Sequence, residues 1–412
     1  MLRSNPQLAV LKLGDNKLGD KGASIIAPAC SVDGRHHQSL TVLDLGFNSI
    51  GDQGVANLSL HMIAGNHVLR NLYLTGNDIK HTGAVALAGA ILHGCSLRCL
   101  HLSANKLGTA GIKVLAQAVA EMDARRHNLL QRQGGIVIAA IKPPAIEELH
   151  IAYLSMQAEG FATLARMLIS NTSLQTLCLA NNEIDDRDMA LLSQALAQNK
   201  GLQLKAIQLS FNKITCVGIE CFMNAIWGSQ TMKEIKIDNN KIQDRGVQLC
   251  AVVLGSVNLE VLDIGYNRVS TVGLKGLMKS LSENSSLRSL SLCGIPMDQI
   301  ASKAVSYALA YNPSLEVLNV DSCCPGYSGQ RYIVAGIVSN HIVKLRTLTG
   351  FTLRGRKGRE TQHCMAFPNK ANTFLFSYYR NLGFASISRR LGKRSSIKFR
   401  AIYVVSLAFR KS

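Results

Sequence analysis

A short pattern recurs along the chain and restricts the possible folds more than any other feature of the sequence. The stretches LTVLDLGFNSIGDQGVANL at 40–58 and LEVLDIGYNRVSTVGLKGL at 259–277 carry apolar residues, an Asn and a Gly at the same offsets. Counted from the first Leu, the pattern is apolar at offsets 0, 3, 5 and 10, with Asn at 8 and Gly at 14. Its origins are Leu8, Leu40, Leu69, Leu97, Ile146, Leu174, Leu204, Met232, Leu259, Leu287 and Leu315, with a weaker twelfth at Leu345. Most origins are 27 to 30 residues apart, a period that indicates a stack of similar units.

Each unit consists of a predicted strand followed by a predicted helix. In the unit that begins at Leu259, the apolar residues of 259–264 suit a short extended segment with alternate side chains on one face. The next apolar residues follow the i, i+3, i+4, i+7 spacing of one helix face, namely Leu274, Leu277, Met278 and Leu281. One such unit cannot bury its own apolar face, so neighbouring units must stack.

Two polar positions of the pattern have predicted structural roles. An Asn side chain offers donors and an acceptor, so stacked Asn residues at offset 8 can satisfy backbone groups that the strand-to-loop corner leaves unpaired. A second set lies two residues before the Gly and predicts helix N-caps: Asp20, Asp52, Thr109, Asp186, Asp244 and Thr271.

The pattern L-x-x-L-x-L-x-x-N-x-[IL]-x-x-x-G resembles the leucine-rich repeat of the ribonuclease-inhibitor subfamily, over roughly residues 5–350. Similar repeats occur in Ran GTPase-activating proteins and in the sensor ends of nucleotide-binding immune receptors. The resemblance implies an α/β fold, a leucine-rich repeat solenoid or horseshoe with parallel strands on the concave face and helices on the convex face.

The repeat is interrupted once inside the chain. The step from Leu97 to Ile146 is 49 residues long, so about twenty extra residues lie near 121–145. They form either a surface loop, which costs little closure entropy, or a protruding contact element. A contact element would expose four basic residues, Arg125, Arg126, His127 and Arg132.

The repeat ends near residue 353, which divides the chain into a solenoid of about 11–12 units at 1–353 and a basic, aromatic-rich tail or cap at 354–412. The tail holds fourteen Lys and Arg against one acidic residue, Glu360, and nine of the 22 aromatic residues. It could cap the last repeat or remain a solvated charged segment. Interleaved basic and aromatic residues could also contact a protein, an anionic membrane surface or a nucleic acid.

Composition favours an intracellular protein. The longest apolar stretches, GIVIAAI and AIYVVSLAF, are far shorter than the ~20 residues of a membrane span, so no transmembrane segment is expected. The eleven cysteines are irregularly spaced and form no C-x-x-C pair, which indicates reduced thiols. We therefore expect the protein in the cytoplasm or the nucleus.

Candidate partner-binding residues occupy positions that the pattern leaves free. Alternation along each strand turns offsets 2, 4 and 6 away from the core, and offset 7 lies beside the corner. Aromatic residues are favoured at protein interfaces, although a corner aromatic can also serve packing. The candidates are Phe47, Tyr73, Tyr153, Phe211, Lys236, Asp263 and Tyr266.

Cysteine and histidine residues cluster at equivalent positions of three consecutive units. His101, His150 and Cys178 share offset 4, and Cys99 lies two residues before His101 on the same face. Neighbouring strands lie about 4.8 Å apart. These four side chains are a Cys₂His₂ set that could hold zinc, and an exposed polar patch without metal is the alternative.

Enzyme motifs are absent elsewhere in the sequence. It contains no G-x-x-x-x-G-K-[ST], G-x-S-x-G or H-E-x-x-H motif, so we predict neither a catalytic activity nor a cofactor. The predicted function is a protein-binding scaffold that uses the concave face and rim. The alternative is a GTPase-activating protein or another regulator of a small GTPase, which the resemblance to Ran GTPase-activating proteins implies. That family typically ends in an acidic tail, whereas this chain ends in a basic one.

Overall fold

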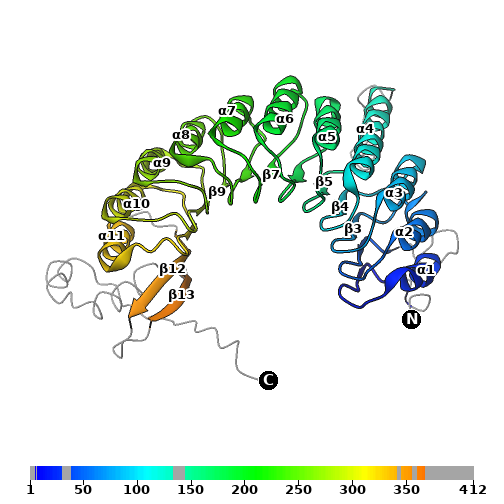
Figure 1. Cartoon of the computed structure of the whole chain (residues 1–412), viewed down its shortest axis with the longest axis horizontal. Coiled ribbons are helices and arrows are strands. Elements are labelled where there is room, and N and C mark those ends of the chain that lie inside the picture. Colours follow the sequence, from blue (N-terminus) through cyan, green and yellow to red (C-terminus); the bar gives the residue numbers. More distant parts are fainter. Residues whose placement is uncertain are drawn as a thin grey trace. The chain divides into compact units, whose positions relative to one another are not determined.

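The computed structural model describes residues 5, 7–29, 39–132, 144–340, 345–354 and 360–366. The chain divides into two compact units, Met1–Lys241 and Ile242–Ser412. In each unit the strands line one side of the repeats and the helices line the other (Figure 1).

The elements alternate in both units as the repeat predicts. The first unit contains β1 (Val10–Lys12), α1 (Gly19–Ala29), β2 (Val42–Asp44), α2 (Asp52–Leu58), the π-helix η2 (Ser59–Ile63), β3 (Asn71–Tyr73), α3 (His81–His93), β4 (Cys99–His101), α4 (Gly108–Arg132), β5 (Glu148–His150), α5 (Ala158–Ser170), β6 (Thr176–Cys178), α6 (Asp186–Gln198), β7 (Ala206–Gln208), α7 (Cys216–Ala225) and β8 (Glu234–Lys236). The second contains α8 (Gln243–Val253), β9 (Val261–Asp263), α9 (Thr271–Glu283), β10 (Ser289–Ser291), α10 (Gln299–Tyr311), β11 (Val317–Asn319), α11 (Gly326–Ser339), β12 (Thr347–Arg354) and β13 (Glu360–Ala366).

Strands of consecutive repeats pair in parallel without any shift in register. From β1 to β8, each strand places its three residues opposite the equivalent three of the next strand. In the second unit β9 to β12 pair in the same way, and β13 then adds to β12 in antiparallel orientation. The predicted α/β leucine-rich repeat solenoid is confirmed.

The apolar positions of the pattern form the core. In the repeat that begins at Leu259, the strand residues Leu262 and Ile264 and the helix residues Leu274 and Leu277 are at most 1% exposed. Burying one such side chain stabilises the fold by roughly 1.5–3 kcal/mol. Because strand and helix supply these residues from opposite sides, the core lies between the two layers of each repeat.

Where a repeat has Asn at offset 8, this Asn links it to the previous repeat, as predicted. Asn77 Nδ2 donates to the carbonyl oxygens of Leu45 and Leu74, each at 3.0 Å. Asn77 Oδ1 accepts from the backbone N–H groups of Asn48 at 3.1 Å and Ile50 at 2.9 Å. One buried side chain therefore satisfies four backbone groups, which would otherwise be unpaired inside the core.

Three repeats replace this Asn with another buried residue. Leu154, Ile295 and Cys323 occupy the position and are at most 2% exposed. The Cys323 thiol donates to Leu292 O at 3.0 Å, so it retains one hydrogen bond of the missing amide. Leu154 N still donates to Asn182 Oδ1 of the following repeat at 2.9 Å, so the backbone link continues past the substitution.

The residues two positions before the Gly do not cap their own helices, so the predicted N-cap role is wrong. Asp186 lies inside the first turn of α6, whose N-cap is Asp185. Its carboxylate accepts instead from the N–H groups of Thr215 and Gly218, at 2.8 and 3.0 Å, at the start of α7 in the next repeat. Two other Asp carboxylates do the same for the next helix, Asp20 toward Gly51 and Gly54 and Asp52 toward Lys80 and Gly83. The caps therefore join neighbouring repeats.

This contact explains the Gly at offset 14. A Cβ atom added to Gly218 would lie 2.6 Å from Asp186 Oδ1, and one added to Gly54 would lie 2.6 Å from Asp20 Oδ1. Real Cβ atoms do not approach oxygen so closely, so the carboxylate and a larger side chain exclude each other. In the second unit, Gly273 and Asp244 show the same distance of 2.6 Å.

A second series of Asn residues, which the sequence pattern did not reveal, ends the helices of the second unit. Asn312 Nδ2 donates to Leu281 O at 2.6 Å and to Asn284 O at 2.8 Å, both in the preceding repeat. Its Oδ1 accepts from Leu315 N at 2.7 Å. Asn340 Nδ2 donates in the same way to Leu309 O and Asn312 O. Asn side chains therefore link neighbouring repeats at the ends of the helices as well as at the strand corners.

Each corner turns through a left-handed residue at offset 7, with φ between 51° and 69°. The eleven residues are Asp15, Phe47, Gly76, Ala104, Tyr153, Asn181, Phe211, Asn239, Tyr266, Gly294 and Ser322. This conformation favours Gly and Asn and costs other residues roughly 1–2 kcal/mol, so the fold sets the backbone here whatever the side chain.

We predict that Asn77→Ala lowers the free energy of unfolding by about 2–6 kcal/mol, because two buried backbone N–H groups lose their acceptor and each unpaired group costs about 1–3 kcal/mol. Chemical denaturation with an unchanged slope measures the loss. Gln53→Ala, which removes an exposed amide from α2, is the matched control and should change stability little. A loss below about 0.5 kcal/mol for Asn77→Ala would show that the amide series does not stabilise the stack.

We predict opposite effects for two helical Gly→Ala substitutions. Gly218→Ala should destabilise the protein by about 1–3 kcal/mol because it displaces the Asp186 carboxylate from two hydrogen bonds. Gly89→Ala in α3 meets nothing within 4 Å and should stabilise it by about 0.4–1 kcal/mol, since it restricts the unfolded chain. The double variant Gly218→Ala/Asp186→Ala should lose less stability than the two single variants lose together, because both substitutions break the same hydrogen bonds. Strictly additive losses would rule out the Asp–Gly contact as the cause.

Candidate functional site

Side chains at offsets 2 and 4 of each strand form a surface that we call the open face. In the first unit, between β3 and β8, it consists of Asn71, Tyr73, Cys99, His101, Glu148, His150, Thr176, Cys178, Ala206, Gln208, Glu234 and Lys236. The central residue of each of these strands is buried against the helices. Since side chains alternate along a strand, its two neighbours point the other way.

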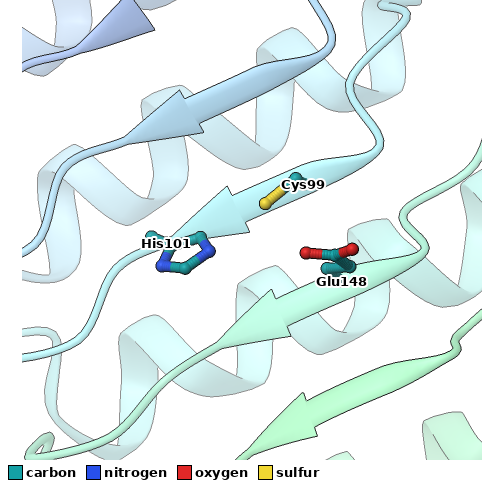
Figure 2. A group of neighbouring side chains, drawn as sticks. All are labelled: Cys99, His101 and Glu148. Carbon is teal, nitrogen blue, oxygen red and sulfur yellow. The ribbon is translucent and has the colours of Figure 1, made fainter. Parts of the chain in front are cut away.

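Three potential metal ligands meet on the open face. Cys99 and His101 are the first and last residues of β4, and Glu148 lies opposite Cys99 on β5. Figure 2 shows the three side chains as neighbours on these two strands. One ligand atom from each lies within 4.8 Å of the other two. The pairing of β4 with β5 therefore fixes a thiol, an imidazole and a carboxyl group side by side.

Aromatic rings extend this cluster to both sides at offset 4. The His101 and His150 rings stack with centroids 3.7 Å apart and an interplanar angle of 14°. On the other side, the Tyr73 ring lies 4.5 Å from His101, tilted by 47°. The parallel register of β3, β4 and β5 places the three rings in one row, which covers the cluster's imidazole from two directions.

Burial determines the protonation of the cluster. Burial, reinforced by the Glu148 carboxylate, raises the pKa of the Cys99 thiol to about 12. Burial, reinforced by His150, lowers the pKa of His101 to about 4. Burial also lowers the pKa of His150 below its usual range. At neutral pH the thiol is protonated and both imidazoles are neutral, so each ring keeps one nitrogen lone pair.

The structure assembles a different set of ligands from the one that the sequence predicted. Cys99 and His101 come together as predicted, but His150 stacks on His101. Cys178 lies on β6, where its thiol donates to Gln208 Oε1 at 3.2 Å. Glu148 was missed. The signal was present, because Glu148 lies two residues before His150 on the same strand face, as Cys99 does relative to His101.

Four large aromatic residues stand at left-handed corners, and we call them the corner aromatics. Phe47, Tyr153 and Phe211 belong to the first unit and are 61%, 52% and 50% exposed. In the second unit Tyr266 is 50% exposed. A partly exposed ring at such a position retains area for contact with another molecule.

Two of the corner aromatics are held against the next repeat. A Cβ atom added to Gly76 would lie 2.3 Å from the Phe47 ring, so this ring covers the backbone of the following corner. The Tyr266 ring stands in the same way over Gly294, and its hydroxyl donates to Ser322 Oγ at 3.4 Å. Both rings are therefore fixed on one face while half of their surface stays exposed.

The two charged candidates on the strands already have local contacts. Lys236 Nζ lies 2.6 Å from Glu234 Oε1 on the same strand. In the second unit, Asp263 Oδ1 accepts from Gly265 N at 3.0 Å. A partner that binds Lys236 or Asp263 must therefore compete with these existing contacts.

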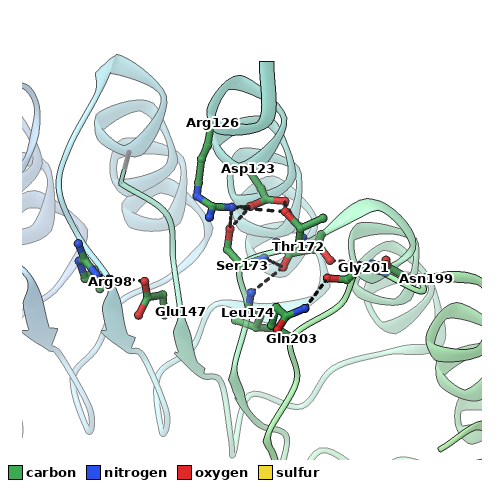
Figure 3. A network of polar contacts seen from close by, with 11 residues as sticks. Arg98, Asp123, Arg126, Glu147, Thr172, Ser173, Leu174, Asn199, Gly201 and Gln203 are labelled. Carbon is green, nitrogen blue, oxygen red and sulfur yellow. Dashed lines mark hydrogen bonds and ion pairs between the residues drawn. The ribbon is translucent and has the colours of Figure 1, made fainter. Parts of the chain in front are cut away.

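The first part of the insertion continues helix α4, and it does not expose Arg126 as the contact-element alternative required. Asp123 and Arg126 of α4 face the segment that precedes β6 (Figure 3). Arg126 donates to Ser173 Oγ at 2.8 Å and lies 3.6 Å from Asp123, with 11% of its side chain exposed. Asp123 accepts from Thr172 N at 2.7 Å. This network joins α4 to the end of the following repeat, the unit that begins at Ile146.

The other predicted residues of the insertion differ from Arg126. Arg125 and His127 are exposed, and Arg125 pairs with Glu121. The Arg132 side chain and residues 133–143 lie outside the described residues, as do residues 367–412 of the tail. Among the helices in the described part of the chain, none combines the length and the apolar character needed to cross a membrane.

Comparison with known proteins agrees with the architecture. The family described as Leucine Rich repeat matches residues 4–27, 36–59, 65–88, 93–116, 170–193, 228–249 and 255–278. Ribonuclease inhibitor of Sus scrofa is 28% identical over 302 residues, which cover 71% of this chain and 65% of the inhibitor. The Mus musculus inhibitor is 27% identical over 307 residues, with the same coverage of 71% and 65%.

NACHT, LRR and PYD domains-containing protein 14 of Homo sapiens is 25% identical over 304 residues, which cover 64% of this chain and 28% of that protein. The chain thus spans less than two thirds of the length of each of these relatives. Together with the paired strands, the amide series and the family match, these similarities show that the chain is a leucine-rich repeat protein with repeats of the ribonuclease-inhibitor-like type.

Proposed function

We propose that the protein is a non-catalytic scaffold that binds a protein partner through its open face and corner aromatics. The name of the pig relative describes an inhibitor of another protein, a ribonuclease. The stack offers an extended surface for such a protein partner, because its repeated strands present the side chains at offsets 2 and 4 in regular rows. The residues that vary from repeat to repeat lie in these rows, whereas those that build the core recur.

The corner aromatics carry this proposal. At the same left-handed position, other repeats of the first unit have Gly76, Asn181 and Asn239, residue types that adopt positive φ readily. Phe47 and Tyr153 adopt φ of 56° and 57° there at a cost of roughly 1–2 kcal/mol each. A strained residue with an exposed side chain points to function, and large rigid rings are the usual anchors of protein interfaces.

Tyr73 and Lys236 would add to this surface on the open face of the first unit. Tyr73 brings an amphipathic ring and Lys236 a charge that Glu234 partly neutralises. Asp263 and Tyr266 provide an equivalent pair, one acid and one ring, in the second unit. Mixed charge around aromatic anchors suits a folded protein surface better than a uniformly charged polymer.

The scaffold would work in a reducing compartment, the cytoplasm or the nucleus. The described cysteines whose side chains are placed carry free thiols, among them the adjacent pair Cys323 and Cys324. The GTPase-activating alternative stays a prediction, which a GTP hydrolysis assay with small GTPases tests. The basic tail could support binding to an acidic partner, and that role also stays a prediction.

We predict that replacing Phe47, Tyr153 and Phe211 together with Asn lowers partner binding at least tenfold while the thermal stability stays the same or rises. Asn relieves the left-handed strain, whereas loss of an interface anchor costs about 2 kcal/mol or more. Affinity capture from native cells with quantitative mass spectrometry identifies the partners, and calorimetry with each purified partner gives the affinity.

The matched control is Trp227→Ala, which removes an aromatic side chain that is 56% exposed beyond the end of α7, away from the corners. It should retain the partners that the triple variant loses. Equal capture by the triple variant and the unchanged protein would refute binding through the corner aromatics.

A further inference from the structure

We propose that Cys99, His101 and Glu148 form a binding site for Zn²⁺ on the open face of the first unit. This inference is independent of the proposed scaffold function, because it rests on the ligand geometry of two neighbouring strands. The three groups are a thiol, an imidazole and a carboxyl group, which together are the ligand types that zinc uses in proteins. Mg²⁺ and Ca²⁺ prefer oxygen ligands alone.

The backbone brings these ligands together before any metal binds. Cys99 and His101 share one strand face, and the ladder between β4 and β5 sets Glu148 opposite Cys99. The ligand atoms lie within 4.8 Å of one another. Zinc bonds of about 2.0–2.3 Å in a tetrahedron separate ligand atoms by roughly 3.3–3.8 Å. Closing the site therefore requires side-chain movements of about 1 Å, with the strands in place.

The surroundings leave the ligand groups available. Cys99 is 3% exposed and its thiol contacts the Tyr73 hydroxyl and the Glu148 carboxylate, so it is held toward the cluster. Glu148 is exposed, and it forms no ion pair with any residue that the structure describes. Arg98 and Glu147, the residues next to Cys99 and Glu148 in the chain, form an ion pair at 3.2 Å.

Zinc binding would replace the contact between the thiol and the carboxyl group by two metal bonds. Cys99 Sγ bonds to the metal as thiolate and its proton passes to solvent, while His101 binds as the neutral imidazole through a nitrogen lone pair. Glu148 supplies a carboxylate oxygen. Three protein ligands leave the fourth tetrahedral position to water, since the His150 ring is stacked on His101 rather than pointed at the cluster.

Titration of the full-length protein with Zn²⁺, and with Co²⁺ as a spectroscopic substitute, tests the site. We expect about one ion per chain and, for Co²⁺, a sulfur-to-metal charge-transfer band. Cys99→Ser should abolish the band, and both Cys99→Ser and Glu148→Gln should weaken Zn²⁺ binding at least about 100-fold, since even residues that only orient ligands change affinity by about 10–100-fold. Glu148→Gln keeps an exposed side chain of the same size and should leave the fold intact.

Cys178→Ser and Cys95→Ser are the matched controls, because they remove buried thiols outside the cluster. Both should bind Zn²⁺ and Co²⁺ as the unchanged protein does. Absence of binding at micromolar Zn²⁺ would overturn the proposal. So would binding that survives Cys99→Ser and Glu148→Gln, since the metal would then be held by other groups.

Discussion

Hydrogen bonds between a side chain of one repeat and the backbone of its neighbour are the interaction on which this structure depends. Amides such as Asn77 satisfy the strand corners, and carboxylates such as Asp186 satisfy the starts of the helices. Strands of three residues cannot hold a sheet alone, and helices of about thirteen residues are marginal in isolation. Each repeat is therefore completed by the next, and the apolar core between the layers makes the stack favourable.

The repeat period and the apolar offsets were sufficient to predict the fold from the sequence. Residues such as Leu262 recur at fixed intervals because only stacking buries them, and the structure places them where the period requires. The destination of the Asp carboxylates was not predictable in the same way. In the sequence, Asp186 lies next to the start of its own helix, α6. Only the three-dimensional stack shows that its carboxylate also reaches the first N–H groups of α7.

The candidate site could be predicted only in part. Position within the repeat identified Cys99, His101 and the corner aromatics, because every repeat turns the same offsets outward. Which neighbours would touch depended on rotamers. His150 stacks on His101, Cys178 turns to Gln208, and Glu148 completes the cluster. Burial of Arg126 was missed for a related reason, since nothing in a charged helical segment shows that Asp123 and Arg126 of α4 both face the segment before β6.

The carboxylate contacts give the stack a direction. Asp20, Asp52 and Asp186 each accept hydrogen bonds from the start of the helix in the repeat that follows, so each carboxylate and the N–H groups that it satisfies lie on opposite sides of a repeat boundary. Removing or duplicating one whole period inside a unit would join two surfaces that already match, while a cut within a period would leave a carboxylate or a helix start without its counterpart. The number of repeats can therefore change in whole steps, which lengthens the rows of outward-facing side chains while the pattern of contacts between repeats is kept.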